Sequence, residues 1–453
     1  MAISAAEQLL IELINRGRLD PAAEAERYGV SLNADLVQGA ISTKAKEVLA
    51  PDAHLEKAAI AHSNWMLKTD NFSHTGVYGS NPSARMEKAG YDFSGTYSWR
   101  ENLAWVGSTN SVSLEKTILE HHVGLYRSES HRVNTFAEDI REIGVAQVSG
   151  AFTQNGVTYK SSMLTENFAK TGNDTFVTGV AYQDKNGNKF YGIGEGLGNV
   201  WFRGGGDGDR TPGSGGYALD VGDRDSVTVT IGRFQNKIGK VELDTSDGNG
   251  KLDFVATGSG REVHLSGSAD LMWGLRDARL LGVNNLDLSG SGGRNDLWGN
   301  DGRNTIHGEG RGDRIWGNKG DDKLFGDRGY DMLDGGFGRD KLFGGGQNDR
   351  LFGGAHNDRL DGGNGNDKLT GGGGADTFVF KSGDDIIRDF ENNIDTIAIK
   401  QSLMDDGDTS ISDLMDCAQI VNDDAVFTFD GGHTLTIDDV SNLNVLANDL
   451  TLI

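Results

Sequence analysis

Residues 335–379 read GGFGRDKLF GGGQNDRLF GGAHNDRLD GGNGNDKLT GGGGADTFV, five consecutive units of nine residues. The units follow the frame G-G-x-G-x-D-x-U-x, where U is apolar, with some replacements of its glycines, and the frame extends back to Gly299. A linker does not keep aspartate and leucine in register, so the period predicts a stacked, repetitive β-structure. The aspartate of the sixth position recurs at Asp313, Asp322, Asp331, Asp340, Asp349, Asp358, Asp367 and Asp376.

The frame also predicts how each unit folds. Six residues would form a turn, and three would form a short strand whose U side chain points inward. Two units make one coil, so like turns stack every 18 residues and the aspartates divide between two edges. Stacked carboxylates at strand spacing repel one another unless a cation lies between them, and Ca²⁺ prefers such hard oxygen ligands. One edge would carry Asp313, Asp331, Asp349 and Asp367, and the other Asp322, Asp340, Asp358 and Asp376.

This nonapeptide resembles the RTX (repeats-in-toxin) family. The resemblance implies a calcium-bound parallel β-roll, placed at residues 256–380, with these eight aspartates as Ca²⁺ ligands. Asn295 and Asn304 stand where the first units would carry aspartate. Other residues replace the glycine of the fourth position, so we expect strained turns and fewer ions than positions. These replacements are Arg311, Gln347 and His356.

The segment after the repeats, residues 381–453, extends this interpretation. Residues 374–399 resemble the sequence that commonly follows such rolls, and they would form closing strands. The last ten residues, NVLANDLTLI, resemble uncleaved type I secretion signals because they are apolar and acidic. The resemblance implies export through type I secretion machinery and folding outside the cell, where Ca²⁺ is abundant.

Composition is consistent with an exported, cation-binding chain. Its formal charge of −24 argues against nucleic acid or anionic membrane as a partner. A single cysteine, Cys417, excludes an intrachain disulfide, and no apolar run is long enough to predict a transmembrane segment. The start, MAISAAEQLLIELINRGRLD, predicts a helix rather than a signal peptide. We therefore expect a secreted, extracellular bacterial protein.

The N-terminal third carries six short motifs in order. They are AHSNWM (61–66), FSHTGVYGSNP (72–82), ENLAW (101–105), SESHRVN (128–134), EIGV (142–145) and MLTENF (163–168). Their order and spacing resemble the bacterial branch of the CAP superfamily, the SCP-like domains of cysteine-rich secretory, antigen 5 and pathogenesis-related proteins. The resemblance implies an α-β-α sandwich, which we place at residues 1–172.

In that family two histidines and one or two glutamates line a cleft, and some members bind Zn²⁺ or another divalent ion there. Carried over by motif, the candidate metal or catalytic residues are His74, Glu101 and His131. Two neutral imidazoles and a carboxylate are a chemically adequate zinc set. Alternatively, both histidines only hydrogen-bond the backbone.

Glu120 and Glu129 are the two candidates for the second glutamate of the cleft, because they lie nearest its expected segment. This chain departs from the family pattern there, with Leu125 in place of the usual Trp and Glu129-Ser130 in place of Pro-Gly.

Other polar residues of this domain favour structural roles. His62 falls on the apolar face of a helix predicted over residues 52–68, so we expect a core histidine. His121 and His122 fall in another predicted helix as surface or packing residues. We expect Glu142 to orient or cap neighbouring groups.

Residues 173–255 resemble the small β-sandwich modules with calcium loops of bacterial surface proteins. Their acidic loop has an EF-hand-like spacing, although Lys189 stands where glycine is expected. The loop is either a calcium site or a plain polar hairpin loop. Its candidate ligands are Asp184, Asn186, Asn188 and Glu195.

Three functions follow from these parts. The first is a secreted calcium-binding protein whose CAP domain recognises an extracellular protein, lipid or cell-surface target. The second is a metal-dependent, peptidase-like hydrolase using the cleft, and the third is a structural adhesin. No nucleophile-elbow motif or convincing triad is present, which favours the first.

Overall fold

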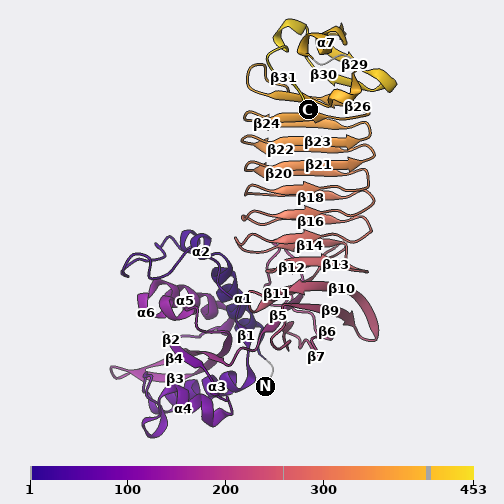
Figure 1. Cartoon of the computed structure of the whole chain (residues 1–453). Helices are drawn as coiled ribbons and strands as arrows, with labels where there is room; N and C mark the ends of the chain where they lie inside the picture. The colour runs from indigo at the N-terminus through magenta and orange to yellow at the C-terminus, as the bar shows by residue number, and fades with distance from the viewer. Residues whose placement is uncertain (1–2, 259, 405–409) are drawn as a thin grey trace. The chain divides into compact units, whose positions relative to one another are not determined.

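The computed structural model describes residues 3–258, 260–404 and 410–453. The chain divides into two compact units, Met1–Ser266 and Gly267–Ile453. The first unit contains helices, a mixed four-stranded sheet and further strands, and the second is mainly a stack of short parallel strands (Figure 1). No described helix is long and apolar enough to cross a membrane.

The first unit begins with a layered α/β arrangement around a sheet with strand order β1-β3-β4-β2. Its strands are β1 (Ala50–Pro51), β2 (Tyr97–Ser108), β3 (Glu142–Gln154) and β4 (Val157–Thr171). Its helices are α1 (Ala5–Leu19), α2 (Pro21–Arg27), α3 (Ala53–Thr69), α4 (Pro82–Ala89), α5 (Leu114–Arg127) and α6 (Glu129–Thr135).

Strand β4 is buried on both faces, which makes this arrangement three-layered. Met163 packs in one buried cluster with Met66 of α3. The next residue, Leu164, packs in another cluster with Ile118 of α5. Because successive side chains of a strand point to opposite faces, helices cover both sides of the sheet. The predicted α-β-α sandwich is confirmed.

Local signals set the helix ends. Asp52 accepts hydrogen bonds from the backbone of His54 and Leu55 at the start of α3. Pro82 opens α4 after the cap Asn81, and Gly90, at φ 114°, ends it in the left-handed conformation. Helix α3 lies where the sequence predicted it.

The middle segment lies in the same compact unit as these layers. Buried Lys251 of β11 contacts Glu12 of α1 at 2.5 Å, and the Asn249 side chain donates to the carbonyl of Val48. A separate β-sandwich over residues 173–255 is therefore not confirmed, because its strands share buried polar contacts with the helical layers. The strands form two sets, β10-β9-β6-β7 and β12-β11-β5-β8. They are β5 (Phe176–Gln183), β6 (Val200–Gly204), β7 (Asp207–Arg210), β8 (Gly216–Asp220), β9 (Ser226–Arg233), β10 (Asn236–Asp244), β11 (Gly250–Ala256) and β12 (Arg261–Leu265).

The second unit is a parallel β-roll built from two sheets, as the nonapeptide predicted. Like positions of alternate units pair in register, for example Leu342 with Leu360. The U side chains, such as Leu333 and Leu351, are 0% exposed and form the core between the sheets. The strands up to the last repeat are β13 (Ala269–Leu271), β14 (Asp277–Leu280), β15 (Asp287–Ser289), β16 (Asp296–Trp298), β17 (Thr305–His307), β18 (Arg314–Trp316), β19 (Lys323–Phe325), β20 (Met332–Phe337), β21 (Lys341–Gly346), β22 (Arg350–Ala355), β23 (Arg359–Asn364), β24 (Lys368–Gly373) and β25 (Thr377–Phe380).

The later coils differ from the expected three-residue strands. Strands β20 to β24 are six residues long, because the glycine-rich half of each unit also pairs with the coil before it. For example, the N–H of Gly346 donates to the carbonyl of Asp327 at 3.0 Å. The residues that replace glycine at the fourth position adopt the left-handed conformation that glycine favours, at φ 72° for Arg311, 79° for Gln347 and 82° for His356. These turns are strained, as expected.

Closing strands follow the last repeat. Strand β26 (Asp384–Ile387) pairs with β30 (Thr434–Ile437), and β27 (Thr396–Ile399) pairs with β31 (Leu450–Leu452), all in parallel. Helix α7 (Ile411–Asp416) and strands β28 (Ala418–Val421) and β29 (Asp424–Thr428) complete this end.

Candidate functional site: two aspartate ladders and a histidine–glutamate cluster

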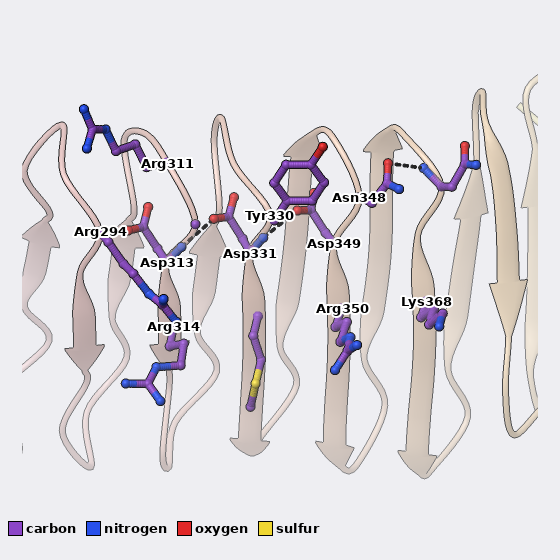
Figure 2. Close-up of a pocket in the computed structure, with 13 residues that line it drawn as sticks. Arg294, Arg311, Asp313, Arg314, Tyr330, Asp331, Asn348, Asp349, Arg350 and Lys368 are labelled. Atoms are coloured by element: carbon purple, nitrogen blue, oxygen red, sulfur yellow. Dashed lines mark hydrogen bonds between the residues drawn. The ribbon is translucent and has the colours of Figure 1, made fainter.

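The nine-residue frame places the aspartates of the repeats in two ladders. On one edge, the backbone N–H of Asp313 donates to Oδ1 of Asp331 at 2.7 Å, and that of Asp331 donates to Asp349 at 2.8 Å (Figure 2). On the other edge, Asp322 donates in the same way to Asp340 at 2.8 Å. Each carboxylate thus holds the coil before it through one oxygen, and the predicted division between two edges is observed.

The second oxygen of these carboxylates has no such partner. The aspartates of the repeats are 0–3% exposed. A buried carboxylate oxygen without a donor is costly, so its position calls for a proton or a cation. The buried Oδ2 atoms without a hydrogen-bond partner belong to Asp313, Asp322, Asp331, Asp340, Asp349, Asp358, Asp367 and Asp385.

These oxygens converge with backbone carbonyls on the open side of the first glycine of each unit. A Cβ atom placed on Gly317 would lie 2.4 Å from Oδ2 of Asp322 and 2.6 Å from the carbonyl oxygen of Gly335. On the other edge, a Cβ on Gly308 would lie 2.6 Å from Oδ2 of Asp313. The glycine therefore keeps open a space lined by hard oxygens, which fits Ca²⁺.

Burial changes the protonation of the ladders. Burial, together with the charges of neighbouring aspartates and against the lowering effect of the backbone hydrogen bond, raises the pKa of Asp313, Asp322, Asp349 and Asp358 to about 8. It raises the pKa of Asp331 to about 7. Without a cation these carboxylates therefore compete for protons near neutral pH. Burial also raises the pKa of Asp340, Asp367 and Asp376, to about 6.

Two aspartates that were not predicted as ligands, Asp385 and Asp395, extend the ladders. Asp367 donates through its N–H to Asp385 at 2.9 Å, and Asp376 donates to Asp395 at 2.8 Å. Asp385 lies nine residues after Asp376, so the period itself could have revealed it. Asp395 lies one residue out of register and gave no such signal.

The asparagines of the first units behave differently from the aspartates. The side-chain N–H₂ group of Asn304 donates to the carbonyl of Leu286 at 3.1 Å and to Asn300 at 3.0 Å. Oδ1 of Asn304 accepts from the N–H of Asn300 at 2.9 Å. The amide of Asn304 thus has protein hydrogen-bond partners for both its nitrogen and its oxygen, where a carboxylate would need a cation.

In the first unit, Glu101 lies at the centre of a polar cluster. Nδ1 of His74 lies 2.8 Å from Oε1 of Glu101, and Nη2 of Arg85 lies 2.5 Å from Oε2. Arg85 also donates to the carbonyl oxygen of His74 at 2.9 Å. The Glu101 side chain is 1% exposed and both its oxygens have partners. No motif pointed to Arg85, which α4 brings to this carboxylate.

His131, from α6, belongs to the same region. Burial lowers its pKa, and the nearby charge of His74 lowers it further. Nδ1 of His131 lies 2.7 Å from Oγ of Ser128. Within the described residues, no three His, Cys, Asp or Glu side chains converge to hold a metal ion. The zinc expectation therefore has no support.

Neither Glu120 of α5 nor Glu129 of α6 is established as the second glutamate of the cleft, because both side chains are exposed. The MLTENF motif instead buries Glu166, whose Oε2 accepts from Asn102 at 3.0 Å. Burial raises the pKa of Glu166 to about 7.

The remaining predicted residues have structural partners. His62 is buried, with Nε2 2.9 Å from the carbonyl oxygen of Ser73, and burial lowers its pKa to about 4. His121 and His122 are buried packing residues of α5. Glu142 accepts a hydrogen bond from Tyr91, and burial raises the pKa of Glu142 to about 7.

The acidic loop between β5 and β6 is held by its own backbone. Asp184 accepts from the N–H of Gly187 at 2.8 Å, and Glu195 accepts from Gly192 at 2.8 Å. Asn186 and Asn188 likewise accept from backbone N–H groups two residues on. Calcium binding at this loop stays a prediction.

Comparison with known protein families agrees with this geometry. Residues 11–161 match the cysteine-rich secretory protein (CAP) family. Four copies of the RTX calcium-binding nonapeptide repeat match at residues 289–310, 298–333, 329–358 and 352–387. The chain therefore carries a CAP domain at residues 11–161 and RTX repeats at residues 289–387. The ladders are therefore those of a calcium-binding RTX roll.

Among solved structures, the chain is similar to that of extracellular lipase LipA from Serratia marcescens. The match has 19% sequence identity and a TM-score of 0.21, and covers 41% of this chain and 42% of that chain. The chain thus spans less than half the length of that relative. A search of curated proteins finds no match.

Proposed function

We propose that this RTX protein is secreted, that Ca²⁺ drives its roll to fold after export, and that its CAP domain is an extracellular recognition module. The aspartates of the two ladders would be the Ca²⁺ ligands, with turn carbonyls completing each site. The observation that carries the proposal is the series of buried Oδ2 atoms without a partner. A cation satisfies them, and a low-Ca²⁺ interior would leave the roll unfolded for export.

Removal of Ca²⁺ from the full chain tests the folding step. With EGTA at about pH 8, we expect amides of the roll to lose their protection from hydrogen exchange, because ionised aspartates then repel one another. Amides of β3 and β4 should stay protected, since that sheet needs no ion. Mass spectrometry of peptides resolves the two units, and unchanged protection of the roll would contradict the proposal.

For the CAP domain, recognition is favoured over catalysis by the pairing at Glu101. A general base or metal ligand must present a free lone pair to its partner, and contacts with His74 and Arg85 leave fewer of these on Glu101. The targets open to such a module remain an extracellular protein, lipid or cell-surface ligand.

The second candidate, a metal-dependent hydrolase, draws on the contact of His74 with Glu101 and on His131 nearby. Calorimetric titration of the full chain with Zn²⁺ in saturating Ca²⁺ separates the two. Stoichiometric binding that a His74→Ala/His131→Ala variant loses would favour the hydrolase. Equal heats for both proteins would leave the cluster as a recognition surface.

A further inference from the structure

One face of the roll carries a groove of about 830 Å³ lined by cationic side chains. Arg314, Arg350 and Lys368 reach it from β18, β22 and β24 of one sheet, and Met332 of β20 lies between the first two (Figure 2). Arg294 and Arg311 reach it from the turns beside them. Tyr330, which is 67% exposed, lies in the same groove.

Most of these charges are not neutralised by the protein. Arg314 forms a bidentate pair with Asp296. Within the described residues, Arg311, Arg350 and Lys368 form no salt bridge, and all three are exposed. Arg350 and Lys368 also pair directly in register. Like charges at paired positions destabilise a sheet, so an anion bound between these two side chains would reduce their electrostatic repulsion.

The aspartates of the adjoining edge do not cancel this charge once Ca²⁺ is bound. Asp313, Asp331 and Asp349 line the groove, but each turns Oδ2 toward a first-position glycine inside the turn, as at Gly308, Gly326 and Gly344. Ca²⁺ at that position neutralises the carboxylates from inside. A positive groove then remains on a chain of formal charge −24.

We propose that this groove binds an acidic polysaccharide whose carboxylates pair with Arg294, Arg311, Arg350 and Lys368. Paired strands of a roll lie about 4.8 Å apart, so Arg350 and Lys368 present two cations at that spacing, with Arg294 and Arg311 on the turns of the same groove. This set suits a linear polymer that carries carboxylates along its length. Guanidinium groups bind carboxylates in a bidentate manner. Tyr330 supplies an apolar ring with a polar tip, which suits a sugar face bordered by hydroxyls.

A nucleic acid fits these observations less well. Duplex DNA carries a charge about every 1.7 Å, and the acidic remainder of this chain would repel so dense a polyanion. A polysaccharide with one carboxylate per one or two sugars is repelled less. The groove also lacks the several aromatic platforms on which successive bases stack, since Tyr330 is the one aromatic side chain among its described lining residues.

Binding of a hyaluronan oligosaccharide to the full chain in saturating Ca²⁺ tests the proposal. Isothermal titration should detect binding that weakens with added salt, and a neutral chitin oligosaccharide should not bind. An Arg350→Glu/Lys368→Glu variant should bind at least about tenfold more weakly. Tyr330→Ala should weaken hyaluronan binding while leaving any binding of poly-glutamate unchanged.

The opposite sheet provides a matched control. Lys341 and Arg359 are paired in register on β21 and β23, outside the groove. A Lys341→Glu/Arg359→Glu variant makes the same change in net charge and should keep wild-type affinity. Circular dichroism in Ca²⁺ first establishes that both variants fold. If the Arg350→Glu/Lys368→Glu variant does not fold, Arg350→Ala/Lys368→Ala takes its place. Equal loss in the control variant, equal binding of poly-glutamate or a single-stranded oligonucleotide, or no binding at low salt would overturn the proposal.

Discussion

Buried carboxylates are treated in opposite ways in the two units. Glu101 in the CAP domain is buried with a histidine and an arginine, so both its oxygens have protein partners. The ladder aspartates in the roll are equally buried, but one oxygen of most of them has none. The first arrangement is complete as folded, whereas the second needs a proton or a cation. Calcium dependence should therefore belong to the roll and not to the CAP domain.

The largest expected effect is that of pH on the calcium-free roll. The folded pKa values of the ladder aspartates, about 6 to 8, lie above the ordinary 3.8. Their protonation therefore contributes stability that is complete below pH 3.8 and is lost as pH rises through about 6 to 8. In EGTA, lowering the pH from about 8.5 to about 5.5 should restore β-structure in far-UV circular dichroism.

The matching control is the same pH change in saturating Ca²⁺, which should leave the spectrum unchanged. If acid restores no structure in EGTA, charge repulsion is not what unfolds the roll, and the contrast between the two units fails.

A smaller effect is expected from Glu101→Gln in the CAP domain. The substitution leaves the guanidinium of Arg85, 9% exposed, without its counter-charge, at a cost of about 3 kcal/mol. Hydrogen exchange of β3 and β4 amides measures this loss, which should be the same with and without Ca²⁺. Asp139→Asn, which breaks the exposed pair with Arg100, should cost under about 1 kcal/mol. Similar losses of stability for Glu101→Gln and Asp139→Asn would show that burial does not make the Glu101 pair stronger than the exposed one.

The smallest effect compares two positions of one ladder. Asp340→Ala removes a carboxylate whose Oδ2 has no partner, and should weaken Ca²⁺ binding on that edge by about tenfold. Asn304→Ala removes a side chain already satisfied by the protein, so Ca²⁺ affinity should change less. Calorimetric Ca²⁺ titration of both variants ranks them, and the reverse order would exclude Asp340 as a ligand.

Much of the roll was predictable from the sequence because each unit repeats one local solution. The nine-residue period fixes which aspartates share an edge and which leucines share the core. The same is true of α3 and α4, whose capping residues are local signals. The six-residue strands were not predicted, because pairing of the glycine-rich halves arises only when coils stack.

The CAP cluster shows the limit of such prediction. The motifs named His74, Glu101 and His131, but not Arg85, although Arg85 occupies one oxygen of Glu101. Likewise, the sequence suggested Glu120 and Glu129 near the cleft, and the structure leaves both exposed while it buries Glu166. Contacts between residues far apart in the chain depend on how helices and sheet pack, which no spacing records.

The sequence by itself determined the roll and its two aspartate edges, because a strict period makes every neighbour a residue 18 positions away. Tertiary structure alone decided that Glu101 is paired with Arg85, that Asp395 extends a ladder, and that five cations from separate coils and turns line one groove. The physical reason is that hydrogen bonds and charges act through space over a few ångströms, and only folding sets those distances.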